Sequence, residues 1–223
     1  MRIANFLGKL FNVRSGEWNR LLLLYSMSLV TLTGCTWADA IVQGAFLQRV
    51  GVQYLPWVII SSAACSIVAL FIYSAFADRV SNTRLLIAIL AISGVGILLG
   101  LAALALGLVG PAYLLLFLVL QVPLLDVYNV HWATYVNGFY DIRAAKRIVP
   151  MLSTSARLAG IIGGLSMPLM NRLLSPVAII GVSVLSLVIM AILAAAMPRL
   201  LHEQRSGSSG WPGSNTPTPP PPG

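Results

Sequence analysis

Residues 85 to 125 read LLIAILAISGVGILLGLAALALGLVGPAYLLLFLVLQVPLL and contain no charged side chain. A helix that crosses the hydrocarbon core of a bilayer needs about 20 apolar residues, so this stretch is too long for a single crossing. The sequence GLVGP at positions 107–111 combines glycines with a proline and predicts a turn. We therefore expect two membrane spans here, at about residues 85–106 and 113–136.

The composition of the whole chain agrees with a lipid setting. Of its 223 residues, 58% are apolar and 9% are charged, whereas a soluble domain has about 25% charged residues. These values exclude a water-soluble globule, and the high hydrophobicity excludes a disordered chain. No segment alternates apolar and polar residues over the length of a strand, which argues against a barrel. The prediction is an all-α membrane protein of six spans, the other four being residues 21–46, 55–76, 148–170 and 177–197.

The positive charges predict the orientation of these spans. Lys and Arg number 14 against 6 Asp and Glu, a net charge of +8, but they form short clusters between apolar runs and show no nucleic-acid-binding pattern. Eleven of the 14 fall on one side of the membrane, and Arg49 and Arg172 fall on the other. This asymmetry predicts that both termini are cytoplasmic and places the protein in the cell (inner) membrane. The eleven are Arg2, Lys9, Arg14, Arg20, Arg79, Arg84, Arg143, Lys146, Arg147, Arg199 and Arg205.

Three regions follow from this pattern. Residues 1–20 form a basic cytoplasmic arm, and residues 21–200 hold the six-helix bundle. Residues 201–223 are rich in serine, glycine and proline and end in a proline run, a composition typical of a disordered tail or linker. If the segment is a linker, the bundle is the N-terminal part of a larger assembly.

Charged residues inside spans are the default functional candidates, because a charge at the centre of a bilayer costs about 2.5 to 3.5 kcal/mol. Asp126 and Arg157 both fall about 14 Å from the cytoplasmic face on consecutive antiparallel spans. They are interpreted either as a structural ion pair or as part of a substrate path, with Asn129 and Trp132 on the same helix face as Asp126.

Asp39 is the third intramembrane charge, and it falls about 27 Å into the first span. It is expected near the external interface, either as a solvated helix end or as a gate together with Gln43, one helical turn later. His131 is interpreted as an interfacial histidine. Small residues spaced by four predict close helix packing at Gly96 and Gly100, and also along Ala156, Gly160 and Gly164.

No pattern in the sequence supports catalysis, a cofactor or a metal site. The two cysteines, Cys35 and Cys65, lie in apolar runs without metal-ligand spacing. The two histidines form no paired motif, and no nucleophile has a base at a suitable spacing. We expect a protein that is not an enzyme and that has no cofactor and no nucleic-acid partner.

Several connecting segments resemble those of known transporters. The loop Ser74–Ser81, followed by Arg84, is similar to the loop between the second and third helices of the major facilitator superfamily. Four further pieces occur in the order found in the ATP/ADP translocase family, the nucleotide transporters of plastids and intracellular bacteria, and its uncharacterised bacterial relatives. These pieces are Glu17–Trp18; Phe46–Gly51 with Tyr54–Pro56; Trp132–Phe139; and Arg143–Arg147 before a glycine-rich span.

The resemblance implies a facilitator-type half built from two three-helix repeats, where such transporters have about twelve spans. It implies a transporter of a nucleotide or another small anionic metabolite, completed by a second copy or a second half-chain. Asp78, Arg79 and Arg84 would then contact the opposite bundle. Arg143, Lys146 and Arg147 would belong to a cytoplasmic loop like the one found in that family. The alternative is a membrane anchor or sensory module that has lost transport.

Overall fold

The computed structural model describes residues 18–77, 79–140 and 142–207, and these residues form helices joined by short turns, with no strand. Six helices in this part of the chain are long and apolar enough to cross a membrane. The prediction of an all-α membrane protein is therefore confirmed. The elements are α2 (Trp18–Arg49), η1 (Val52–Tyr54), α3 (Leu55–Ala77), α4 (Asn82–Ala105), α5 (Val109–Val119), η2 (Leu120–Val127), α6 (Tyr128–Asn137), α7 (Ile142–Leu173) and α8 (Pro176–Gly207).

Glycines at positive φ mark two of the turns between spans. Gly51 has a φ of 110° and Gly107 a φ of 79°, a region of backbone space in which a Cβ atom is unfavourable. The predicted break therefore exists, but it lies at residues 106–108, because α5 already begins at Val109. At the other end of the chain, α8 continues to Gly207, so residues 201–207, which we assigned to the tail, are helical. The remainder of the predicted tail and residues 1–17 of the predicted arm lie outside the described residues.

The fourth span combines α5, η2 and α6 into one run, Val109–Asn137. Its middle part, η2, is a π-helix that contains Pro123. A proline in an α-helix lacks the N–H group and its ring clashes with the carbonyl four residues earlier, here that of Val119. The wider π turn accommodates the ring, and it also changes the direction in which the following side chains point. Asp126 is one of these side chains.

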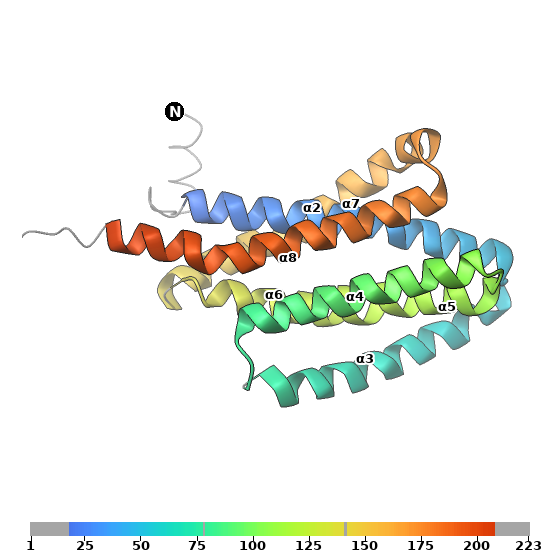
Figure 1. The fold of residues 1–223 in the computed structure, drawn as a ribbon, viewed down its shortest axis with the longest axis horizontal. Helices are drawn as coiled ribbons and strands as arrows, with labels where there is room; N and C mark the ends of the chain where they lie inside the picture. Colours follow the sequence, from blue (N-terminus) through green and yellow to red (C-terminus); the bar gives the residue numbers. More distant parts are fainter. Residues whose placement is uncertain (1–17, 78, 141, 208–223) are drawn as a thin grey trace, which may run out of the picture.

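The spans pack in two groups, as Figure 1 shows: α2, α7 and α8 on one side, and α3, α4 and the α5–η2–α6 span on the other. The first span packs on the fifth and sixth, and the fourth span packs on the second and third. Across the two groups, the first span contacts the fourth and the third contacts the sixth. Most of these contacts have a counterpart when spans one, two and three are exchanged with spans four, five and six, but the fifth span contacts the fourth and sixth more than the second span contacts the first and third. Because consecutive spans alternate in direction, the exchange relates two inverted three-helix units.

The predicted small-residue contacts are confirmed in one helix and wrong in another. A Cβ atom on Gly96 or Gly100 of α4 would clash with Val119 or Leu116 of the fourth span, so both glycines allow close packing. Gly160 and Gly164 of α7, in contrast, have nothing within 4 Å of an added Cβ. The glycine that faces a neighbour is Gly163, where a Cβ would lie 2.8 Å from Thr36 Cγ2 of α2.

Candidate functional site

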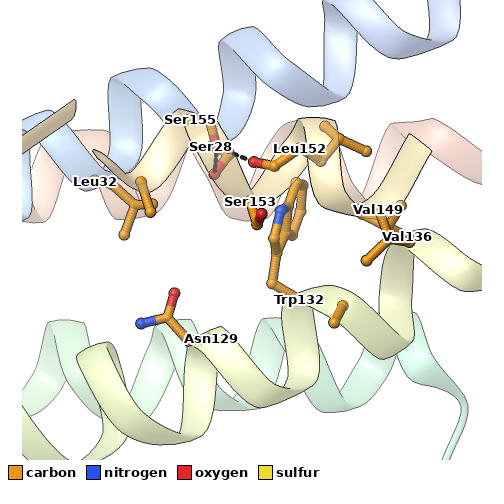
Figure 2. A pocket seen from close by; sticks show the side chains of 11 residues that line it. Ser28, Leu32, Asn129, Trp132, Val136, Val149, Leu152, Ser153 and Ser155 are labelled. Carbon is orange, nitrogen blue, oxygen red and sulfur yellow. Dashed lines mark hydrogen bonds between the residues drawn. The ribbon is translucent and has the colours of Figure 1, made fainter. Parts of the chain in front are cut away.

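A cavity of about 180 Å³ lies between α2, α6 and α7. Figure 2 shows side chains from these three helices converging on it. It joins the first, fourth and fifth spans, so it lies where the two three-helix units meet. Its lining is Ser28, Leu32, Asn129, Trp132, Ala133, Val136, Val149, Leu152, Ser153, Ser155 and Ala156.

Trp132 is the most distinctive side chain of this cavity. It is 6% exposed, and its indole nitrogen, Nε1, is buried without a hydrogen-bond partner among the described residues. The ring stacks between Tyr128 and Tyr135, at centroid distances of 5.9 and 5.7 Å. In Figure 2 the indole projects from α6 across the cavity towards α7, with Ser153 beside it. A buried donor without an acceptor is costly, so this N–H group would gain from an acceptor brought within its reach.

The other polar groups of the cavity are hydroxyls and one amide. Ser155 Oγ lies 2.8 Å from Ser28 Oγ, which joins α7 to α2. The Ser153 hydroxyl donates to the carbonyl of Pro150 at 2.7 Å. The side-chain amide of Asn129 donates to the carbonyl of Leu125, which leaves its oxygen free to accept. The cavity can therefore hold a small solute by hydrogen bonds, and no ionisable side chain lines it.

The structure brings Asn129 and Trp132 together at the cavity but places Asp126 elsewhere. Asp126 lines a separate open groove of about 600 Å³ between α3 and the fourth span. Its Oδ2 atom lies 2.5 Å from Ser66 Oγ of α3. Asn129 lines both the groove and the cavity, so the two spaces adjoin at this residue.

The predicted pair of Asp126 with Arg157 is not formed, although the structure describes both residues. Asp126 is half-buried beside α3, whereas Arg157 is exposed on α7. Figure 1 shows α3 and α7 at opposite edges of the bundle. Equal depth along two helices does not determine the faces that carry the side chains, and the π-helical turn directs Asp126 towards α3.

The remaining predicted site residues lie away from the cavity. Asp39 is half-buried and its Oδ2 accepts a hydrogen bond from Gln43 Nε2 at 2.8 Å, within α2. Arg79, Arg84 and Lys146 are exposed, and Arg147 is half-buried. Asp78 and the side chain of Arg143 lie outside the described residues. The inter-bundle role of these loops remains a prediction.

A buried cluster around His131 was not predicted. His131 is 1% exposed; its Nε2 lies 2.8 Å from the Asn82 carbonyl oxygen and its Nδ1 lies 3.0 Å from the Tyr73 hydroxyl. A carbonyl only accepts, so Nε2 carries a proton, and in the neutral ring Nδ1 accepts from Tyr73. The ring thus joins α3, α4 and α6. The sequence offered only a lone histidine, because the partners are 58 and 49 residues away.

Metal binding finds no support in the part of the chain that the structure describes, where no group of three or more His, Cys, Asp or Glu side chains is placed to hold an ion. No family model, curated protein or solved structure matches the chain. What the structure and composition establish is a six-helix membrane protein with a mainly apolar cavity, lined also by three serines and Asn129, between its first, fourth and fifth spans.

Proposed function

We propose that this protein is one bundle of a facilitator-type transporter and moves a small anionic solute by alternating access together with a second copy or half-chain. The packing of the spans supports this, since most of their contacts have a counterpart when the two inverted three-helix units are exchanged. Inverted repeats of this kind, with a binding site at the repeat interface near the bilayer midplane, are a common transporter architecture. The resemblance of the loops to the ATP/ADP translocase family agrees with it.

The observation that carries the proposal is the Trp132 indole N–H, buried without an acceptor in a cavity at the junction of the two units. A solute oxygen would complete its hydrogen bonding. The volume of about 180 Å³ is smaller than the roughly 300 to 1,000 Å³ of pockets for drug-sized ligands. We therefore propose a solute of a few non-hydrogen atoms for this bundle; a nucleotide, as the resemblance implies, would need cationic groups from the second bundle.

Two basic residues on α7 supply the argument for an anion. Lys146, Ser153 and Arg157 are spaced by seven and four, which places them on one helix face, and all three are exposed. Lys146 also lines a cavity of about 540 Å³ that shares Val149 with the Trp132 cavity. An anion entering from the predicted cytoplasmic end would pass Lys146 before it reaches Trp132, with Arg157 beyond.

Thermal stabilisation of the purified protein tests the proposal, because a ligand that binds only the folded state raises its stability. The probes are acetate, phosphate, a dicarboxylate, neutral glycerol and ATP. We expect at least one small anion to raise the unfolding temperature of the wild type and of Trp57→Phe, a matched change at an exposed tryptophan, but not of Trp132→Phe. Equal stabilisation of all three proteins, or none by any small anion, would contradict the proposed site.

We further propose that the protein lies in the cell membrane with both termini in the cytoplasm, as the charge asymmetry predicts. Single cysteines at Gly110, in the first turn of α5, and at Ser81, directly before α4, should react with an impermeant thiol reagent from opposite sides, Gly110 from outside. Labelling of both from one side would contradict the orientation.

The alternative function is that of a membrane anchor or sensory module. It is favoured by the lining of the Trp132 cavity, which includes no charged side chain. An anchor predicts no stabilisation by any solute, together with a bound protein partner that remains on the bundle in detergent. The solute panel therefore separates the two functions.

A further inference from the structure

Asp126 lies in surroundings that provide little support for a negative charge. It is the only ionisable residue among those that line its groove, whose other members are apolar, small or uncharged polar side chains. A carboxylate at the centre of a bilayer without a cation costs about 2.5 to 3.5 kcal/mol. Among the described residues, its hydrogen-bond partner is the Ser66 hydroxyl on α3. Binding a proton would remove the cost of the charge.

Ser66 is placed to serve the carboxyl group in both of its protonation states. Its Oγ lies 2.5 Å from Asp126 Oδ2 and 2.9 Å from the carbonyl oxygen of Ser62. A hydroxyl has one proton, so it can donate to only one of these acceptors at a time. When Asp126 is ionised, Ser66 donates to the carboxylate. When Asp126 is protonated, the carboxyl group donates to Ser66, and Ser66 donates to Ser62. The change requires rotation of one hydroxyl.

The backbone at this position gives a second, independent indication of function. Asp126 belongs to the π-helical segment η2, which spans Leu120–Val127 around Pro123. π-helical turns are rare and occur frequently at functional sites, and the wider turn redirects the side chains that follow it. Here the turn directs Asp126 into the groove. A local change at a π turn can therefore accompany a change in the charge of Asp126.

The other titratable groups near η2 are hydrogen-bonded to other residues or lie on other helices. Of the elements packed against η2, α3 contributes only Cys65 and Tyr73, and no charged residue. His131 on α6 is hydrogen-bonded to Tyr73 and Asn82. The groove includes none of these groups. The remaining titratable residues on α2, α4, α5 and α6 are Arg20, Tyr25, Cys35, Asp39, Arg49, Arg84, Tyr113, Tyr128 and Tyr135.

We propose that Asp126 is a reversible proton-binding site in the groove between α3 and the π-helical segment of the fourth span. The carboxylate takes a proton from water, its charge falls to zero, and the Ser66 hydroxyl turns from Asp126 to Ser62. Asn129, which lines both this groove and the Trp132 cavity, places the proton site next to the solute site. If the protein is a transporter, this proton would serve as its coupling ion. That role rests on the proposed function, whereas the proton site itself does not.

Infrared difference spectroscopy in lipid nanodiscs, recorded across an acid titration, tests the site directly. We expect the wild type to gain a carboxylic C=O stretching band at low pH. Asp126→Asn should lose the component of this band that depends on Ser66, whereas Asp39→Asn, a change at the other described carboxylate within the spans, should retain that component. Ser66→Ala should retain the band at a different frequency, because the carboxyl group has lost its hydrogen-bond partner.

Two outcomes would overturn the proton site. One is a band that persists in full in Asp126→Asn, and the other is a Ser66→Ala band at the wild-type frequency. If Asp126→Asn does not fold, as judged by size-exclusion chromatography, the Ser66→Ala result still decides. Sodium chloride in place of acid is the control for a metal cation: a carboxylate shift produced by sodium and not by protons also contradicts the proposal. The measurement involves no solute. The proton site can therefore be confirmed even if the proposed transport is refuted, and the proposed transport can be confirmed even if the proton site is refuted.

Discussion

The helices α2 and α3 are both membrane spans, yet they relate to the rest of the protein in opposite ways. In the most apolar 18-residue stretch of each helix, 56% of α2 but only 11% of α3 is buried inside the protein. Yet α3 is the more hydrophobic of the two. Trp57 and Phe71 of α3 are 72% and 76% exposed. In lipid, apolar side chains lose nothing by facing outward, so the more polar helix occupies the centre, where its serines and threonines find partners.

The two helices are also held by different forces. Close packing of Gly163 on Thr36 joins α2 to α7, and hydrogen bonds add to it, such as that from the indole of Trp37 to Ser166 Oγ at 2.9 Å. Polar contacts tie α3 to its neighbours, notably Ser66 with Asp126 and Tyr73 with His131. We therefore expect steric changes to be most harmful along α2, and loss of single polar groups to be most harmful along α3.

The largest effect is expected from Gly163→Ala. An added Cβ would lie 2.8 Å from Thr36 Cγ2 and 2.9 Å from Thr36 Cβ, so α2 and α7 must move apart at a cost of about 1 to 3 kcal/mol. At the adjacent Gly164 the added Cβ meets nothing within 4 Å, and alanine there should stabilise the helix by about 0.5 to 1 kcal/mol. Unfolding free energies in mixed detergent measure both. The same sign for the two variants would contradict the close α2–α7 contact.

His131→Leu tests how α3 is attached. The change leaves the Tyr73 hydroxyl and the Asn82 carbonyl without their partner, at a cost of about 1 to 3 kcal/mol. Tyr73→Phe breaks only one of the two hydrogen bonds and should cost about 0.5 to 1.5 kcal/mol. The same unfolding measurement applies. If the tyrosine change were the more harmful, the histidine would not be the residue that connects α3, α4 and α6.

A smaller effect is expected from the serine pair between α2 and α7. Ser28 and Ser155 are both buried and their hydroxyl oxygens are 2.8 Å apart. Hydrogen bonds between helices in membranes contribute about 0.6 kcal/mol on average. A double-mutant cycle with alanine at both positions should give a coupling energy near this value. Coupling above about 2 kcal/mol would mean that polar contacts hold α2 as strongly as packing does.

No energetic coupling is expected between Asp126 and Arg157. Asp126 contacts α3, whereas Arg157 is exposed on α7, the helix that packs on α2. Replacing each with alanine, alone and together, should give effects that add within about 0.5 kcal/mol, as for independent sites. A larger interaction energy would restore the ion pair predicted from the sequence.

Much of the fold follows from the sequence because membrane spans leave a one-dimensional signal. An uncharged stretch of the right length must form a helix in lipid, where every backbone polar group needs an internal partner. The spans predicted from Leu55 and from Val177 begin within one residue of the observed helices. Asn129 and Trp132, three residues apart, line the same cavity as their spacing suggested, but Asp126, which we placed on the same face, lines the groove beside α3 instead.

Helix-to-helix contacts carried no such signal, and only the tertiary structure decided them. Spacing alone made Gly160 and Gly164 as suitable for packing as Gly163, but the rotation of α7 about its axis turns Gly163 towards α2. In the same way, the π turn at Pro123 directs Asp126 to Ser66, 60 residues earlier in the chain, and away from Arg157. The sequence by itself determined which segments enter the membrane, because the insertion of a segment into lipid depends on its own hydrophobicity and length. The partners of each polar group depend on how six helices rotate against one another, which is a property of the assembled bundle.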